Sequence, residues 1–245
     1  MELVHLDVAD DVATITLDSP ANRNALSAQL TRELFDALAA AEADDRVKVV
    51  VLTAAGTVFC SGADLSEAVS ADLSEGPRTI VALQRAVLAL DKPVVVRVQG
   101  AARAGGIGLI AAADIAIADR AATFALTEVR LGLAAAAISL TVLPRMSSRA
   151  GAAALLTGST FDAVHAAEAG LLTTATDDLD GEVARVVGEL RKGAAQGLRE
   201  GKRLLNRDLI ATLDERGEEV AQLSARLFAS DEAREAMLAF LSRRK

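Results

Sequence analysis

The sequence predicts an α/β fold in which amphipathic helices alternate with strands that are buried on both faces. Segments 47–52 and 94–98 are apolar runs, rich in Val and without polar alternation, as is typical of strands covered on both sides. A helical repeat of apolar residues, Ile80, Leu83 and Val87, separates the two runs. Strands joined through helices run parallel with right-handed crossovers, so their functional loops lie at the strand ends.

The elements of the N-terminal half follow from local patterns. Segments 3–8 and 12–17 are strand-like and flank a short polar turn, which predicts a hairpin. Ser27 can cap a helix whose leucines recur every four residues, and Pro77 favours the start of a second helix. The other elements expected here are a turn-rich loop at 18–24, glycine-bearing loops after strands 47–52 and 94–98, a short buried helix beginning near 109, and a strand at 115–118.

Beyond Gly132 the strand signals nearly vanish and helical periodicity takes over. Helices are expected at 138–146, 150–156, 163–169, 181–192, 198–209, 215–228 and 231–242. We expect a core domain over residues 1–190 and a C-terminal helical region over 191–245, whose helices pack on the core or on another subunit. No linker rich in Pro or Ser and no repeat of fixed period is visible.

Composition excludes several classes of function. The chain has 245 residues, 51% of them hydrophobic and 24% charged, which is enough to bury a large core. Its formal net charge is −8 and its aromatic content is 2%, without Trp or Tyr, so we do not expect a nucleic acid partner. One Cys and two His make a disulfide or a zinc site improbable, and a reducing, metal-free compartment is expected.

No segment predicts export or membrane insertion. The first residues lead directly into a strand pattern, without the basic and apolar regions of a signal peptide. The longest apolar run, 104–113, ends at Asp114 and is shorter than the ~18–20 residues that span a bilayer. We therefore expect a soluble, cytoplasmic protein with no membrane partner.

Two glycine-bearing loops, 59–65 and 100–108, follow neighbouring buried strands. Because such strands end side by side, the backbone N–H groups of Ala63 and Gly105 could converge on one oxygen, and small side chains would let a substrate approach. Asp64 is a residue type that caps helix N-termini, where the helix dipole favours negative charge. The pattern favours an oxyanion hole.

Two other interpretations of these loops stay open. Glycines after strands often do no more than turn the chain. Segment 106–111 also matches the G-x-G-x-x-A pattern of dinucleotide sites, although seven residues separate Val98 from Gly106 where that pattern requires an immediate turn.

Segments 22–26, 59–65, 100–114 and 124–133 resemble the crotonase superfamily, which comprises enoyl-CoA hydratases, isomerases and their relatives. The likeness covers nearly the whole chain. It implies a crotonase-like α/β fold, a spiral of ββα units with a C-terminal helical trimerisation region, in a homotrimer or a hexamer built as a dimer of trimers. It also implies an acyl-CoA thioester as substrate, so coenzyme A is part of the substrate and no separate cofactor is expected.

The resemblance assigns roles to individual residues. Ala63 and Gly105 stand where backbone amides hold the thioester oxygen, and Glu128 falls on a catalytic glutamate of the hydratases. Glu128 lies in an apolar stretch, where desolvation would raise its pKa; on its own, such a Glu is more often a surface or salt-bridged residue. The expected coenzyme and substrate contacts are Arg23, Ala25, Ser61, Asp64, Leu65, Gly106 and Gly108.

One departure from the family pattern affects the expected reaction. The second glutamate of typical hydratases corresponds to Gly108, so Glu128 would have to deprotonate water and then protonate the α-carbon. A single glutamate is also the arrangement of isomerases that carry a proton between the α- and γ-carbons. The sequence predicts a lyase of fatty acid metabolism that hydrates a 2-enoyl-CoA. A Δ3,Δ2-enoyl-CoA isomerase and a non-catalytic acyl-CoA-binding protein are the alternatives.

Finer features suggest a substrate branch. Segments 105–109 and 127–133 resemble the methylglutaconyl-CoA hydratases, and Arg103 or Arg130 could pair with a distal carboxylate.

The remaining candidates are the phosphate contacts and the other nucleophiles. In the family a lysine often follows the Gly-Ala-Asp motif, and Ser66 occupies that position here. Phe240 and the basic residues 243–245 are other candidates for contacts with the coenzyme phosphates. Cys60 is expected to be a small buried hydrophobe, and neither His fits a hydrolase triad.

Overall fold

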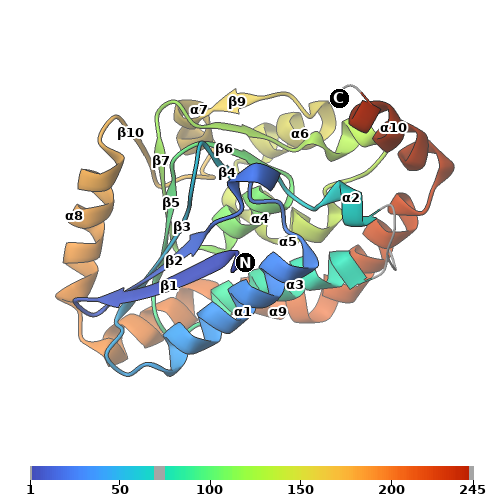
Figure 1. Ribbon diagram of the computed structural model, residues 1–245. Helices are drawn as coiled ribbons and strands as arrows, with labels where there is room; N and C mark the ends of the chain where they lie inside the picture. Colours follow the sequence, from blue (N-terminus) through green and yellow to red (C-terminus); the bar gives the residue numbers. More distant parts are fainter. Residues whose placement is uncertain (1, 69–74, 243–245) are drawn as a thin grey trace.

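The computed structural model describes residues 2–68 and 75–242, and a six-stranded sheet lies at its centre (Figure 1). In spatial order its strands are β1 (Val4–Ala9), β2 (Val12–Leu17), β3 (Val49–Ala54), β5 (Val94–Val98), β7 (Ile115–Asp119) and β10 (Thr174–Thr176). β1 and β2 form the predicted antiparallel hairpin, whereas the following neighbours pair in parallel. The predicted buried strands are confirmed, with β3 lying slightly later than expected.

A second, smaller sheet lies beyond the ends of these strands. Its order is β4 (Val58–Cys60), β6 (Ala101–Arg103), β8 (Thr123–Ala125) and β9 (Phe161–Asp162). β3, β5 and β7 of the large sheet are followed in sequence by β4, β6 and β8 respectively. The glycine-bearing segments were expected as loops, and β9 and β10 lie between expected helices, in segments where no strand was expected. Strands of two or three residues are too short to show an alternating pattern.

Helices cover both faces of the large sheet. One side carries α1 (Ala28–Ala43), α3 (Glu75–Ala89), α4 (Gly105–Ala112) and α5 (Ala136–Arg145), and the other carries α8 (Leu179–Arg191) (Figure 1). As predicted, Ser27 caps α1, its side chain accepting a hydrogen bond from Leu30 N at 3.2 Å. α8 buries Leu179, Val183 and Val187 against the valines of β3 and β5. The α/β prediction is therefore confirmed.

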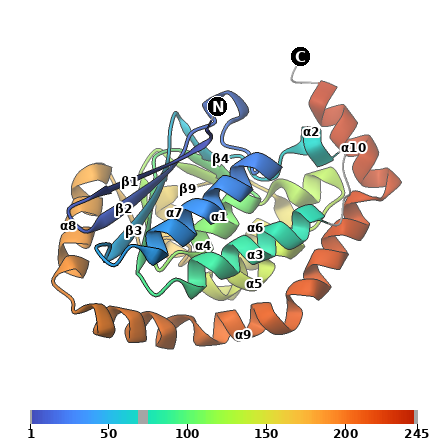
Figure 2. The ribbon, with the colours of Figure 1, turned by 60° about the horizontal axis from the view of Figure 1, so that its bottom comes forward.

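α9 (Ala195–Phe228) is one continuous helix of 34 residues, where two helices were expected. It runs along α3 and α5 at the base of the molecule (Figure 2). At the expected break, Asp214 accepts hydrogen bonds from Arg85 of α3, and a Cβ on Gly217 would lie 2.9 Å from Val81 of α3. These contacts with α3 hold the segment between the two expected helices in helical form.

A buried ion pair joins α9 to the core. The Nζ of Lys202 lies 2.9 Å from the Oδ2 of Asp114, with the two side chains 3% and 7% exposed. Lys202 also donates to the carbonyl groups of Val87 and Lys92, and Asn206 donates to Asp114 Oδ1 at 2.7 Å. Burial lowers the pKa of Lys202, and the charge of Asp114 opposes that shift.

Shorter elements complete the described structure. They are α2 (Leu65–Ala68), α6 (Ser148–Thr157), α7 (Ala163–Glu168), α10 (Asp231–Ser242) and the 3-10 turns η1 (Pro20–Asn22) and η2 (Thr127–Leu131). Within residues 2–68 and 75–242, no helix is both long enough and apolar enough to cross a membrane.

Candidate active site

The first loop of the site leaves β4 and turns at Gly62. Gly62 has φ +90°, a left-handed conformation that favours glycine, and a Cβ there would lie 2.8 Å from Ala104 Cβ. The loop is tied to the segment before α1, because Leu26 N donates to Gly62 O at 2.8 Å and Ser61 N donates to Arg23 O at 3.1 Å. Ala63, the next residue, therefore follows a segment that is tied down at two points, and it forms a β-bridge with Leu26.

The second loop turns from β6 into α4 at Ala104. This alanine has φ 47° and ψ −120°, a conformation that L residues rarely adopt and that stores roughly 1–3 kcal/mol of strain. The sharp turn places Gly105 at the start of an eight-residue helix, earlier than the expected start near 109. A Cβ on Gly62 would lie 3.4 Å from Gly105 N, so the two loops touch.

Neither Ala63 nor Gly105 donates a backbone hydrogen bond to any other described residue. Both residues line the same cleft. Gly105 N also lies at the N-terminus of α4, where the helix dipole favours an anion. Two backbone amides without an acceptor among the described residues, on touching loops that line one cleft, are the donors that an oxyanion hole would need.

Glu128 lies in η2, directly after β8, and lines the cleft. The residue as a whole is partly exposed, but its Oε2 is buried and has no hydrogen-bond partner among the described residues. Burial raises the pKa of Glu128 to about 7, against a smaller lowering by its own backbone N–H. A carboxyl group with this pKa can both accept and return a proton near neutral pH.

The cleft has a volume of about 1250 Å³ and is bordered by both loops, η2, α1, α3 and the C-terminal helices. It brings together most of the residues that the sequence analysis singled out, namely Arg23, Ala25, Ser61, Ala63, Asp64, Leu65, Gly105 and Glu128. Asp64 accepts a hydrogen bond from Asn22 Nδ2 at 2.7 Å, which joins the two segments that carry the expected coenzyme contacts.

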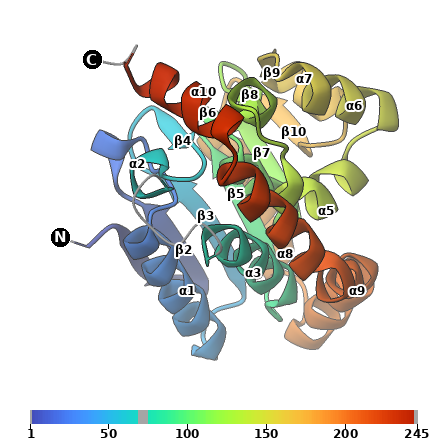
Figure 3. The same cartoon turned by 90° about the vertical axis from the view of Figure 1, so that its right-hand side faces the viewer.

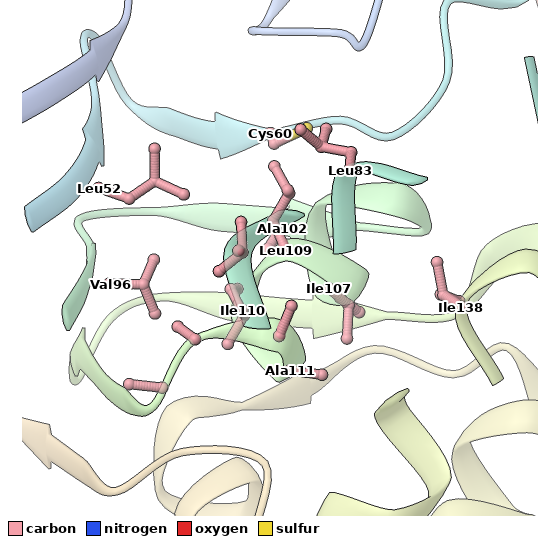
Figure 4. Close-up of a cluster of buried hydrophobic side chains, with 14 of the residues drawn as sticks. Leu52, Cys60, Leu83, Val96, Ala102, Ile107, Leu109, Ile110, Ala111 and Ile138 are labelled. Atoms are coloured by element: carbon pink, nitrogen blue, oxygen red, sulfur yellow. The ribbon is translucent and has the colours of Figure 1, made fainter. Parts of the chain in front are cut away.

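Gly106 and Gly108 are not among the residues that line the cleft. A Cβ on Gly106 would lie 2.7 Å from Cys60 Cβ, and one on Gly108 would lie 2.5 Å from Ile138 Cγ2. Figure 4 shows Ile138 beside Ile107 in this buried cluster. Both glycines thus serve close packing around α4, and the space of a second carboxylate is filled by an isoleucine.

The other polar candidates have distinct surroundings. The guanidinium of Arg103 donates to Ala102 O and to both oxygens of Thr123, and burial lowers its pKa. Arg130 is exposed and lines the cleft. Cys60 is fully buried and its pKa is raised to about 12, which makes it a poor nucleophile, as expected.

Several residues of the cleft have no signal in the sequence. Ser224 and Phe228 of α9 and Ala236 and Ala239 of α10 line it from the C-terminal end of the chain. An apolar helix face does not reveal which distant loop it will cover. Phe240 and residues 243–245, considered above for the coenzyme phosphates, have side chains outside the described part of the structure.

Solved structures share this architecture over nearly the whole chain. A crystal structure of an enoyl-CoA hydratase from Mycobacterium avium superposes with a TM-score of 0.92 at 45% identity, covering 98% of this chain and 96% of that chain. The two sheets, their covering helices and the C-terminal helices are therefore those of the α/β crotonase fold, and the protein is an enzyme of the crotonase superfamily.

Within that class, the chain belongs to the enoyl-CoA hydratase/isomerase family, whose model matches residues 7–245. The 4-chlorobenzoyl coenzyme A dehalogenase-2 of an Arthrobacter species is 35% identical over 195 residues, covering 74% of this chain and 71% of the relative. The 1,2-epoxyphenylacetyl-CoA isomerase of Escherichia coli is 33% identical over 186 residues, covering 73% and 71%. Membership of the family implies an acyl-CoA substrate. The names of these two relatives, a dehalogenase and an isomerase, indicate different reactions.

Proposed function

We propose that the protein hydrates a 2-enoyl-CoA reversibly, with Glu128 as its single acid and base. The observation that carries this proposal is the buried carboxyl group with a pKa of about 7, in one cleft with two free backbone amides on touching loops. Several similar structures, among them the 45%-identical one, are of enoyl-CoA hydratases.

The residues present can perform each step. The Glu128 carboxylate takes a proton from water while the oxygen of that water bonds to the β-carbon. The displaced electron pair moves to the thioester oxygen, where the N–H groups of Ala63 and Gly105 stabilise the enolate, each typically worth ~10²–10³ in rate. Protonated Glu128 then returns its proton to the α-carbon, which regenerates the carboxylate.

Isomerisation of a 3-enoyl-CoA to a 2-enoyl-CoA is the second candidate. Ile138 fills the space that a carboxylate at position 108 would need, so α4 supplies no second proton carrier to the site. In this reaction Glu128 takes the α-proton and returns it to the γ-carbon, and no water is consumed. A binding protein without turnover is the third reading.

The coenzyme is proposed to lie along Arg23, Ala25, Ser61, Asp64 and Leu65, which form one wall of the cleft. For an acyl group with a distal carboxylate, such as methylglutaconyl, Arg130 is a suitable partner because it is exposed at the cleft.

Absorbance at the conjugated thioester band distinguishes the three readings. Loss of the band from a 2-enoyl-CoA shows hydration, and its appearance from a 3-enoyl-CoA shows isomerisation. Binding of both esters without either change, together with no effect of Glu128→Gln, leaves only the binding protein.

We also propose a homotrimer or a dimer of trimers. Leu204 and Leu205 of α9 and Leu156 of α6 are 74%, 55% and 71% exposed, and large apolar side chains of this kind are typical of subunit interfaces. Light scattering after size-exclusion chromatography measures the mass, and a monomer at micromolar concentration would contradict the proposal.

A further inference from the structure

The C-terminal helix α10 lies near α2 at the edge of the molecule (Figures 2 and 3), and it borders the cleft. Its residues Ala236 and Ala239 line the cleft together with Phe228 of α9. Leu65 of α2 packs against the same cluster as Met237 of α10. The last helix therefore borders the site of its own chain, although the sequence suggested a role in assembly.

α10 also packs directly on the turn that carries Glu128. Ala233 is fully buried and forms a small apolar cluster with Leu133 and Met237. Gly132 has φ +69°, and a Cβ there would lie 3.2 Å from Ala233 N. The backbone of α10 thus touches a position whose left-handed conformation favours glycine.

Hydrogen bonds connect this contact to Glu128 itself. The carbonyl oxygen of Glu128 accepts from the N–H of Gly132 and, at 3.0 Å, from that of Leu133. These two residues are the ones against which Ala233 packs. A shift of α10 would accordingly change the position of the Glu128 backbone.

Neighbouring charges do not explain the raised pKa of Glu128. The charged groups on η2 and on the helices packed against it are Arg130, Arg149, Asp231, Glu232, Arg234 and Glu235. None of them contributes to the pKa shift of Glu128, and neither does Arg103; burial alone raises that pKa. The raised pKa is therefore an effect of burial, and α10 packs on the turn that carries Glu128.

We propose that Ala233 is a positioning residue for Glu128, and that the docking of α10 on Gly132 holds the catalytic turn and keeps water from its carboxyl group. The role rests on the proposed function of Glu128 and applies to hydration and isomerisation alike. Through this contact, α10 acts in the active site of its own chain.

The test compares pH profiles of kcat/KM for the intact protein and three variants. Ala233→Leu adds a side chain between α10 and Gly132, and Met237→Ala loosens the same contact without adding volume. Each variant is expected to lower kcat at least tenfold with less than a threefold change in KM. The acid limb of the kcat/KM profile, which lies near pH 7 in the intact protein, should move down by at least one pH unit. Glu235→Leu, on the exposed side of α10, is the matched control and should leave the profile unchanged.

Two results would overturn the inference while leaving the proposed function intact. One is an unchanged acid limb in Ala233→Leu and Met237→Ala when circular dichroism shows that both variants are folded. The other is an equal loss in Glu235→Leu. If instead Glu128→Gln is as active as the intact protein, the proposed function fails and the role of α10 falls with it.

Discussion

Ile138 Cγ2 lies where the side chain of any residue other than glycine at position 108 would begin, 2.5 Å from an ideal Cβ. Ile138 is 2% exposed, and Gln84, whose Cδ lies 3.3 Å from the same ideal Cβ, donates to Ala137 O at 2.8 Å. α3 and α5 thus hold an apolar group at the position that the resemblance assigns to a second acid of typical hydratases. The following predictions concern this pair and the other contacts of the site.

Gly108→Glu alone should lower the free energy of unfolding by roughly 1–3 kcal/mol or more, because overpacking a closed core forces neighbours out of place. Adding Ile138→Ala should recover part of that loss by making room. Urea denaturation of both variants measures the difference. Equal stability of Gly108→Glu and the intact protein would show that the position is not closed.

Glu128→Gln should reduce turnover by about 10²–10⁴, the usual contribution of a positioned acid or base, while acyl-CoA binding persists. In the intact protein, kcat/KM should fall as the pH drops below about 7, because the reaction starts from the carboxylate form of Glu128. Stopped-flow absorbance across pH 5–9 gives the profile. A flat acid limb would contradict this role.

The same residue predicts a pH dependence of stability. The pKa of Glu128 is raised in the folded protein, so folding favours the protonated form, and this contribution to stability is lost as the pH rises from the ordinary pKa of Glu toward about 7. Glu128→Gln should therefore stabilise the protein by about 1–3 kcal/mol at pH 8 and have little effect at pH 4. Thermal unfolding at both pH values checks the sign.

Gly62→Ala should destabilise the protein by roughly 1–3 kcal/mol, because φ +90° is strained for alanine and the new Cβ would meet Ala104. It should also reduce kcat by displacing Ala63 N–H. Gly188→Ala is the matched control, since nothing lies within 4 Å of its Cβ and α8 gains up to about 1 kcal/mol of helix propensity. Similar unfolding midpoints for the two variants would contradict the expected strain.

Removing one member of the buried ion pair should be costly. Lys202→Met leaves the Asp114 carboxylate without its cation and should lower the free energy of unfolding by about 3–5 kcal/mol. The double variant with Asp114→Asn should lose clearly less, because no unpaired charge remains. A double-mutant cycle in urea gives the coupling, and additive losses would argue against a direct interaction.

The parts of the fold that could be predicted are those with strong local patterns. The buried strands are visible as runs of Val, and the cap at Ser27 is a local hydrogen bond. Most of the candidate site could also be located, because Ala63 and Gly105 follow neighbouring parallel strands. Each of these features is predicted by a pattern of a few residues that are adjacent in the sequence.

The parts that could not be predicted depend on contacts between distant segments. α9 stays continuous because α3 packs along it, and Ile138 fills the space at Gly108 from another helix. Ala236 lines the same cleft as Gly105 and Glu128, although more than a hundred residues separate it from each of them in the sequence. Local periodicity contains no information on which helix will meet which loop.

The ion pair between Lys202 and Asp114 has a consequence for the order in which the chain can fold during synthesis. Asp114 leaves the ribosome together with the strands of the large sheet, long before α9 has been translated. Until Lys202 has been translated, the Asp114 carboxylate lacks the cation with which it pairs in the folded chain, so we expect this end of the nascent sheet to stay hydrated until the long helix has been made.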